Sequence, residues 1–334
     1  MHIQIIAEAG VNHNGSFDTA VQMADAAKAA EADFVKFQTF RPEALTSKYA
    51  QKAHYQKETT GAQESQLDML KRLMLPDQAF RELKGHCDKI GIGFLSTPFD
   101  LESIALLNTF HMPFWKVPSG EVTNLPYLQA IAQTKRPVVM STGMCDMDEI
   151  GAALKVLREY GAPKITLLQC NTEYPTPYRD VNLRAMQTMR DAFGVETGYS
   201  DHTKGIMVPI AAAALGATVI EKHFTLDRDM EGPDQKSSLE LPELAEMIRS
   251  IRIIEQSLGD GAKRPSLSEA GNRVVARKSI VAARPIEKGQ VLIGEMLAAK
   301  RPGDGISPMR WQEVLGKKAD RDYQPDEPIS PGIL

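Results

Sequence analysis

The sequence predicts an α/β fold in which a (β/α)8 barrel is followed by a small β-rich domain. Eight short apolar segments alternate with helical segments over the first three quarters of the chain, which is the size and order of such a barrel, roughly 250 residues. Polar residues gather where the apolar segments end, as they do on the active-site face of a barrel. After residue 259, Pro and Gly recur every few residues, leaving room only for short strands and single helical turns.

The elements are expected in regular alternation. The apolar segments, read as strands, are 3–10, 32–40, 92–99, 114–121, 137–144, 164–175, 195–203 and 217–224. Helices are expected at 17–32, 77–89, 101–109, 125–134, 147–160, 183–193, 206–215 and 241–258. Residues 41–75 are polar and weakly patterned, which is typical of a long functional loop. An open doubly wound sheet is disfavoured because EAGVNHNG, after the first strand, lacks the Gly-rich phosphate-binding turn.

Three segments follow from this pattern. Residues 1–258 are expected to form the barrel, 259–275 a Gly/Ser/Lys-rich linker, and 276–334 a β-rich domain. A domain of about 60 residues is marginally stable alone and is expected to pack on a barrel, its own or a partner's.

Composition excludes several classes of protein. The net charge of −4 and pI near 6.0 give no global reason to expect binding to nucleic acid or to a membrane. Three unevenly spaced cysteines fit reduced thiols better than a disulfide framework. The first strand begins at once and carries Glu8, unlike a signal peptide, and no apolar run is long enough to span a bilayer. A cytoplasmic protein is expected.

Two histidines follow neighbouring strands of the expected barrel. His202 ends the segment VETGYSDHT and His223 ends ATVIEKHF. The carboxyl ends of adjacent parallel strands lie side by side, so the two imidazoles are expected to meet above the sheet. They either hold a divalent metal or are hydrogen-bonded loop histidines.

The other strand ends supply cations, hydroxyls and acids. Lys116 and Lys36, with several neutral donors, suit a phosphate or carboxylate ligand. The neutral donors are Ser119, Ser141, Asn171, Thr172 and Ser200. Glu8 and Glu121 are candidates for proton transfer, or else salt-bridge partners of the lysines.

Nine ordered motifs carry a resemblance that covers nearly the whole chain. They are AEAGVNHNGS, DFVKFQTF, FLSTPFD, KVPSGE, STGM, YPTPYRDVNL, GYSDHT, EKHFTLD and GPDQKSS. In this order they resemble the sialic acid synthase family. KSIVAARPIEKGQVL and KRPGDGIS are similar to that family's C-terminal antifreeze-like (SAF) module. Finer matches, ESQLDML, CNTEYPTP, NLPYL and GISPMRW, resemble its bacterial legionaminic acid synthase branch.

The resemblance implies an activity. The family condenses phosphoenolpyruvate with an N-acylated aminohexose to give a nine-carbon 2-keto sugar acid, releasing phosphate. For the legionaminic branch, the sugar is 2,4-diacetamido-2,4,6-trideoxymannose and the product N,N'-diacetyllegionaminate. N-acetylneuraminate synthesis from N-acetylmannosamine is the alternative within the family.

The resemblance also implies residue roles. His202 and His223 would bind a divalent cation, usually Mn²⁺ with Mg²⁺ or Co²⁺ as alternatives. From the strand-end acids and the resemblance together, Glu121 is expected to handle the proton of the attacking water, with Glu8 supporting the water at the metal site or Lys36. Phosphoenolpyruvate would be held by Lys116, Ser119, Ser141, Ser200 and either Asn171 or Thr172. The sugar would be contacted by Gln38, Glu121, Tyr174, Asp234 and Arg301. Arg301 would reach from the C-terminal module into the barrel of a partner, which implies a homodimer.

Two other classes remain open from the residues alone. A lysine Schiff-base aldolase would use Lys36 or Lys116 as the nucleophile and would be trapped by borohydride with pyruvate. A non-catalytic binding protein is disfavoured because the strand-end acids, lysines and histidines are all present.

Overall fold

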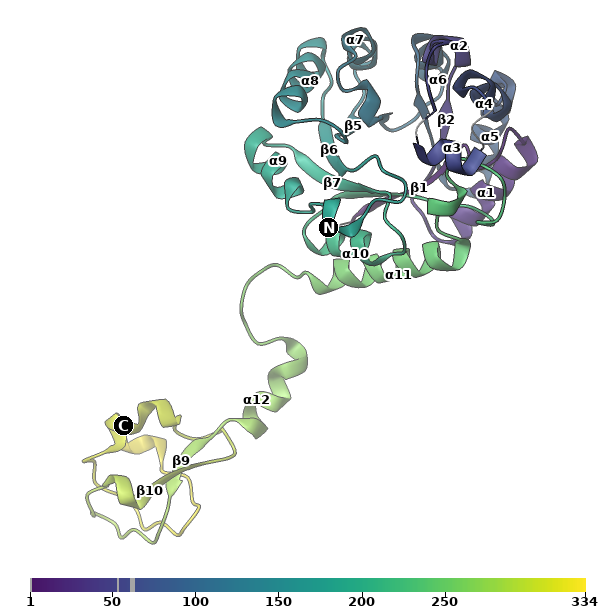
Figure 1. Cartoon of the computed structure of the whole chain (residues 1–334). Coiled ribbons are helices and arrows are strands. Elements are labelled where there is room, and N and C mark those ends of the chain that lie inside the picture. The colour runs from purple at the N-terminus through teal and green to yellow at the C-terminus, as the bar shows by residue number, and fades with distance from the viewer. Residues whose placement is uncertain (1, 53, 61–63) are drawn as a thin grey trace. The chain divides into compact units, whose positions relative to one another are not determined.

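The computed structural model describes residues 2–52, 54–60 and 64–334, and its first unit is the predicted barrel (Figure 1). Eight parallel strands form one sheet in the hydrogen-bonded order β3-β2-β1-β8-β7-β6-β5-β4. The edge strands β3 and β4 also contact each other, so the barrel is nearly closed. The strands are β1 (Gln4–Gly10), β2 (Phe34–Thr39), β3 (Gly93–Pro98), β4 (Trp115–Val117), β5 (Val138–Ser141), β6 (Ile165–Cys170), β7 (Glu196–Asp201) and β8 (Val219–His223).

Helices surround the sheet, and some of them start and end on clear local signals. They are α1 (Phe17–Ala29), α5 (Asp77–Ile90), α6 (Leu101–Asn108), α7 (Leu125–Gln133), α8 (Met147–Tyr160), α9 (Ala185–Phe193), α10 (Met207–Ala214) and α11 (Leu241–Ser257). Ser16 caps α1, its hydroxyl accepting from the amide of Thr19. Helix α8 has a capping box from Asp146 and Glu149, and ends at Gly161 in the left-handed region. Every predicted barrel helix is present, with ends shifted by up to three residues.

Apolar side chains of the strands and helices form the main hydrophobic core of the barrel unit. Ile5, Phe37, Trp115 and Tyr199 are among its fully buried members. Burying this apolar surface stabilises the unit by roughly 25 cal/mol for each Å² removed from water. The rigid core fixes where each strand ends, and therefore where the polar residues of those ends lie.

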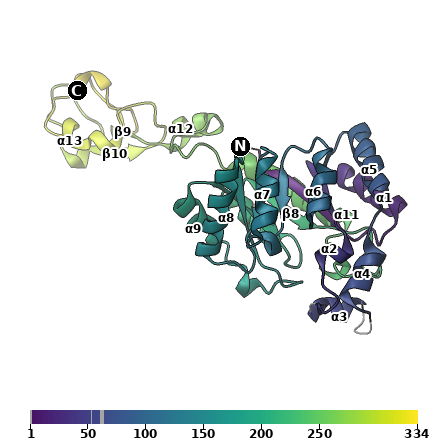
Figure 2. The ribbon, with the colours of Figure 1, turned by 90° about the horizontal axis from the view of Figure 1, so that it is seen from above.

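Residues 41–75 differ from the predicted loop. They contain three short helices: α2 (Pro42–Leu45), α3 (His54–Thr60) and α4 (Gln66–Leu73), which lie near one another in Figure 2. Met69 and Leu73 of α4 pack with Val11 and Phe40 in a small apolar cluster of their own. Helices α2 and α4 are held by this tertiary packing, and α4 also by the side-chain cap at Ser65. A weak sequence pattern reveals neither contact.

The chain divides into two compact units, Met1–Gly259 and Asp260–Leu334. The second unit has a two-stranded antiparallel sheet, β9 (Ser279–Ala282) with β10 (Leu297–Lys300), short helix α13 (Trp311–Val314) and an apolar core of its own. The predicted linker is not all irregular, because helix α12 (Ala270–Ala276) begins inside it. All residues from 258 to 278 are solvent-exposed, as expected for a connection.

None of the helices in the described part of the chain combines the length and apolar character that crossing a bilayer requires. The three cysteines are free thiols, as predicted.

Candidate active site

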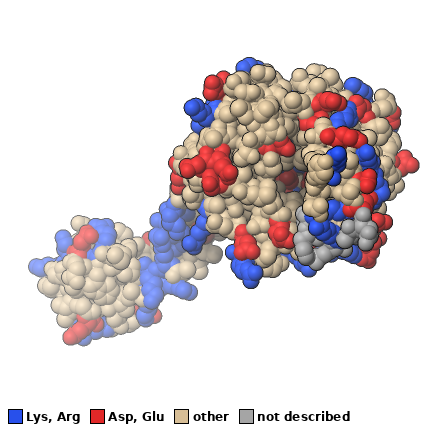
Figure 3. All heavy atoms as spheres, turned by 45° about the horizontal axis from the view of Figure 1, so that its top comes forward, with Lys and Arg blue, Asp and Glu red and all other residues tan. Residues whose placement is uncertain are grey.

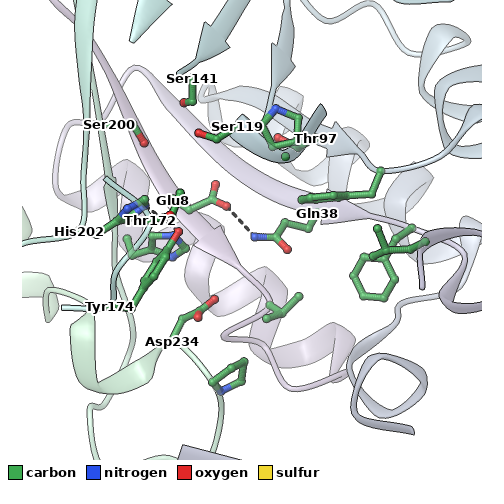
Figure 4. Close-up of a pocket in the computed structure, with 18 of the residues that line it drawn as sticks. Glu8, Gln38, Thr97, Ser119, Ser141, Thr172, Tyr174, Ser200, His202 and Asp234 are labelled. Atoms are coloured by element: carbon green, nitrogen blue, oxygen red, sulfur yellow. Dashed lines mark hydrogen bonds between the residues drawn. The ribbon is translucent and has the colours of Figure 1, made fainter. Parts of the chain in front are cut away.

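A cavity of about 330 Å³ opens where the carboxyl ends of the strands meet. Side chains from all eight strand ends or the loops after them line it, together with residues of the helices in 41–75. The close-up in Figure 4 shows Ser119, Ser141 and Ser200 on one side of it, and Tyr174 with Asp234 on another. This is the face on which the sequence predicted a site.

Four buried charges occupy the floor of the cavity. Lys36 Nζ lies 2.5 Å from Glu8 Oε2 and 3.8 Å from Glu221 Oε2, and Lys116 Nζ lies 3.5 Å from Glu221 Oε1. All four side chains are at most 7 % exposed. The cluster is balanced, with two acids and two lysines on four different strands. Burying a charge is costly without a partner, and here each has one.

Hydroxyl groups extend this network. Lys116 Nζ donates to Ser141 Oγ at 2.7 Å, and Lys36 Nζ donates to Thr97 Oγ1 at 3.1 Å. Ser200 Oγ donates to Glu221 Oε1 at 3.0 Å. Glu221 Oε2 has no hydrogen-bond partner among the described residues, so this buried oxygen is available to a ligand.

Burial and neighbouring charges shift the pKa values of Glu8 and Glu221 in opposite directions. Burial raises the pKa of Glu8, with Lys36 opposing and the Glu221 carboxylate adding to the rise. Burial also disfavours the charge of Glu221, but Lys116 and Lys36 outweigh it and lower the pKa of that carboxyl. Burial lowers the pKa of Lys116, partly opposed by Glu221. Glu8 is therefore the acid that takes up a proton more readily, and Glu221 is the one held as a carboxylate.

The two histidines meet as the sequence predicted. Their ring centroids are 5.5 Å apart, and both rings are buried in the cavity wall. His202 Nδ1 faces the backbone carbonyl of Asn171, so it carries the proton, and Nε2 accepts from the Tyr174 hydroxyl at 2.8 Å. The Tyr174 ring stacks on His202 with centroids 4.0 Å apart.

The histidine pair fits a divalent metal ion in its chemistry. Burial lowers the pKa of His202 to about 4 and that of His223 well below its usual value, so both imidazoles are neutral and can donate a lone pair. His223 Nδ1 is buried without a hydrogen-bond partner in the described chain. The described residues contain no cluster of three or more His, Cys, Asp or Glu suited to an ion. Such an ion would therefore have positions open to water or substrate.

Gly10 allows the backbone at the end of β1 to pass close to the side chains of His223 and Gln38. Its φ of +55° lies in the left-handed region, and a Cβ there would sit 3.3 Å from both His223 Cε1 and Gln38 Nε2. Any other residue would strain the backbone and press on both side chains. Beside it, Gln38 Nε2 donates to Glu8 Oε1 at 3.1 Å, as the dashed line in Figure 4 marks.

The structure brings most of the predicted site residues together. The cavity lining includes Glu8, Lys36, Gln38, Lys116, Ser119, Ser141, Thr172, Tyr174, Ser200, His202, His223 and Asp234. Burial and the nearby Glu8 raise the pKa of Asp234 to about 7.

Two predicted residues of the barrel unit do not line the cavity, and a third, Arg301, belongs to the other unit. Glu121 is in the short 3-10 turn Ser119–Glu121, accepts from Asn124 Nδ2 at 2.6 Å and is not part of the cavity lining. Asn171 turns its carboxamide oxygen to the amide of Glu173, so of the predicted pair only Thr172 lines the cavity. Arg301 belongs to the C-terminal unit, where its Nε donates to the carbonyl of Ala276.

Sequence reasoning gave no role to Glu221. It lies in the EKH cluster of β8, two residues before His223. In the neighbouring strand β7 its register partner is Ser200, which also faces the cavity. The period-two alternation of a strand was the available signal: in ATVIEKH, Glu221 and His223 share a face.

Comparison with known protein families shows to which family the chain belongs. The model of the NeuB family matches residues 23–263, and that of the SAF domain matches residues 277–332. The chain belongs to the NeuB family. The resemblance seen in the sequence motifs, and the SAF module expected after the barrel, are thereby confirmed.

Relatives within the NeuB family match over nearly the full length. The N,N'-diacetyllegionaminic acid synthase of Campylobacter jejuni is 52 % identical over 97 % of this chain and 98 % of its own. The synthase of the same name from Legionella pneumophila is 44 % identical over 94 % of this chain and 89 % of its own. Among solved structures, N-acetylneuraminic acid synthetase from Leptospira borgpetersenii is 33 % identical, with a TM-score of 0.72 over 81 % of this chain and 90 % of its own.

Proposed function

We propose that the chain condenses phosphoenolpyruvate with 2,4-diacetamido-2,4,6-trideoxymannose and water, forming N,N'-diacetyllegionaminate and phosphate. Two synthases named for this product match almost the whole chain. The observation that carries the proposal is the buried cluster of Lys36, Lys116, Glu8 and Glu221 beside two neutral imidazoles. Buried ion pairs are weak evidence of stabilisation, because replacing them with well-packed apolar residues is often neutral or favourable, so four charges buried at the mouth of the barrel favour a catalytic role.

Phosphoenolpyruvate fits the donors of β4 to β7. Lys116 supplies a cation, and Ser119, Ser141 and Ser200 supply hydroxyl groups on one side of the cavity. Thr172 adds a hydroxyl group close to Ser119, since both lie within 3 Å of where a Cβ of Gly143 would be. These groups surround anionic oxygens with charge-assisted and neutral hydrogen bonds. Gln38, Tyr174 and Asp234 are left on the other side for the open-chain sugar.

The reaction then requires one new carbon–carbon bond and one proton path. C3 of phosphoenolpyruvate attacks C1 of the sugar aldehyde, whose oxygen takes up a proton, and water adds to C2. The bond between C2 and the bridging oxygen then breaks. Phosphate leaves with that oxygen, and C2 becomes the ketone carbon. A divalent cation held by His202 and His223, Mn²⁺ before Mg²⁺ or Co²⁺, would supply Lewis acidity to the aldehyde.

We assign proton transfer to Glu8, with Lys36 holding its position. Glu8 lines the cavity, carries a raised pKa and is hydrogen-bonded to Gln38. Glu121, which the sequence suggested for this step, is turned to Asn124. Glu8→Gln should lower kcat by roughly 10²–10⁴-fold, while Glu121→Gln should stay within about tenfold. The opposite ranking returns the role to Glu121.

We further propose a homodimer in which Arg301 of one subunit completes the barrel of the other. Two inactive variants test this by complementation. Lys116→Met disables a barrel, and Arg301→Ala removes the donated arginine. After the two are denatured together and refolded as mixed dimers, about a quarter of wild-type activity should return. The estimate assumes that half the dimers are mixed and each has one competent barrel. No recovery would place Arg301 in its own subunit's site or in none.

The substrate is tested by assaying phosphate release with each sugar in turn. The proposal expects kcat/KM for 2,4-diacetamido-2,4,6-trideoxymannose to exceed that for N-acetylmannosamine, and activity to vanish with a chelator and return with Mn²⁺. A preference for N-acetylmannosamine would make the chain an N-acetylneuraminate synthase. Borohydride inactivation in the presence of pyruvate would instead support a Schiff-base aldolase.

A further inference from the structure

The two sides of the cavity differ in chemistry. Its charged lining residues are Glu8, Lys36, Lys116, Glu221 and Asp234, and all come from the strands or the loop after β8. The described residues between 40 and 75 contribute no charged side chain to the lining. They contribute Phe40, Leu45, Met69, Leu70 and Leu73, with Thr46, Gln56 and Gln66.

The apolar side is a built wall. Val11, Phe40, Met69 and Leu73 are at most 5 % exposed and pack together as a separate cluster. Leu45 of α2 and Leu70 of α4 lie against this cluster but are only partly buried, and both line the cavity. Their free surface therefore faces the ligand space, with a close-packed layer behind it that resists collapse.

The position of this wall indicates which part of a ligand it meets. The helices of 41–75 follow β2, and Phe99 follows β3, whereas the phosphate-binding donors end β4 to β7 on the other side of the barrel mouth. The reacting aldehyde of the sugar must face phosphoenolpyruvate at those donors. The remaining carbons then extend past Gln38 and Glu8 toward α2 and α4.

We propose that Leu45 and Leu70 form the subsite for C6 of the sugar and select a methyl group there over a hydroxymethyl group. The inference rests on the proposed synthase function and deepens it by locating the choice between the two sugar classes. A methyl against these leucines gains about 0.8 kcal/mol for each buried carbon. A hydroxyl there would lose its water without gaining a partner from either side chain. Apolar pockets discriminate against an added hydroxyl by up to about 10²-fold.

Two sugars that differ only at C6 isolate this contact. We suggest comparing 2-acetamido-2,6-dideoxymannose with N-acetylmannosamine, as substrates with phosphoenolpyruvate or, where turnover is absent, as competitive inhibitors of the diacetamido sugar. The wild type should favour the 6-deoxy sugar by about 10–100-fold. Leu70→Gln should reduce that ratio to within about threefold, since glutamine supplies a partner for the hydroxyl and removes the apolar contact.

Two matched variants control the experiment. Lys71→Gln introduces the same side chain one position along α4, at an exposed residue paired with Glu43, and should keep the wild-type ratio. Leu70→Met preserves an apolar surface and should also keep it. The KM for phosphoenolpyruvate should be unchanged in all three if α4 remains folded.

The outcomes separate the inference from the function on which it rests. If wild-type protein releases phosphate with the diacetamido sugar but Leu70→Gln and Leu45→Gln leave the C6 ratio unchanged, the subsite lies elsewhere and the synthase function stands. If wild-type protein uses no aminohexose with phosphoenolpyruvate, the function itself fails and the subsite fails with it.

Discussion

The barrel unit contains some ion pairs that are almost completely buried, whereas the ion pairs of the C-terminal unit are exposed. In the barrel, Lys36 with Glu8 and Lys222 with Asp201 are almost completely buried. In the C-terminal unit, pairs such as Lys300 with Asp326 are about half exposed or more, and Figure 3 shows acidic and basic side chains scattered over the visible surface. Exposed pairs contribute little to stability, whereas a buried charge that loses its partner is strongly destabilising. Buried charges in this molecule therefore have a specific catalytic or structural role, whereas the exposed charges keep the surface hydrated.

The buried charges of the barrel have two tasks. Those facing inward, Lys36 and Lys116 with Glu8 and Glu221, line the cavity. Asp201 and Lys222 do not line it and precede the two histidines on β7 and β8. Lys222 Nζ donates to Asp201 Oδ2 at 2.5 Å and also bonds the carbonyl of Thr203. The second pair thus joins the two strands at the point where His202 and His223 emerge.

The largest effect is expected at Lys116. Lys116→Met removes the cation from the phosphoenolpyruvate side and leaves Glu221 with only the more distant Lys36. We expect kcat/KM to fall by about 10³–10⁴-fold, which corresponds to about 4–5.5 kcal/mol. Phosphate release measures it. Lys164→Met, in an exposed pair with Glu196 on the same unit, is the matched control and should change it less than twofold. Equal effects of the two variants would contradict the comparison.

Lys222→Met is expected to destabilise the barrel by about 3–5 kcal/mol, since it leaves the Asp201 carboxylate buried and unpaired. Urea unfolding followed by the fluorescence of Trp115, which is buried in the barrel, reports this unit. The double variant Lys222→Met with Asp201→Leu should recover much of the loss. A loss below about 1 kcal/mol for the single variant would show that the pair is not needed for stability.

A smaller, pH-dependent effect is expected from His13. Burial lowers its pKa to about 4 from an ordinary value of 6.5, so the folded protein holds it neutral. Between these values the unfolded chain binds a proton that the folded chain does not. Stability is therefore lost as pH falls from 6.5 toward 4, by at most about 3 kcal/mol from this group. His13→Gln should flatten the pH dependence of barrel unfolding by up to one proton. An unchanged slope would exclude His13 as its source.

The smallest effect is expected in the C-terminal unit. Lys300→Met breaks its exposed pair with Asp326 and should change the free energy of unfolding of that unit by less than about 0.5 kcal/mol. Trp311, which packs on the core of this unit, provides the fluorescence signal. A change of 2 kcal/mol or more would mean that surface charges stabilise this unit in a way the barrel comparison does not allow.

Much of the site was predictable because the carboxyl ends of all strands of a barrel lie on one face, so residues at those ends become neighbours. His202, His223, Lys36 and Lys116 could be brought together from the sequence, since each lies in or directly after a recognisable apolar segment. Glu121 could not be placed, because the short turn after β4 rotates it toward Asn124 and breaks the strand's alternation. Position along the chain says nothing about such a rotation.

The helices of 41–75 were missed for another reason. With four, seven and eight residues, α2, α3 and α4 are too short to be stable alone or to show clear periodicity. Helices α2 and α4 are held by contacts with residues distant in sequence, such as Val11. The same physical cause hid the apolar wall from sequence reasoning, since Leu45 and Leu70 become neighbours of the cavity only after the barrel has formed.

The path of one oxygen atom tests the central claim most directly. Phosphoenolpyruvate labelled with ¹⁸O at the oxygen bridging C2 and phosphorus is incubated with the protein, Mn²⁺ and 2,4-diacetamido-2,4,6-trideoxymannose. The account predicts that the label leaves with phosphate, and that one unlabelled nine-carbon keto acid forms for each phosphate released. Label retained at C2 of the product, or phosphate formed without a keto acid, would contradict condensation by C–O cleavage in this barrel.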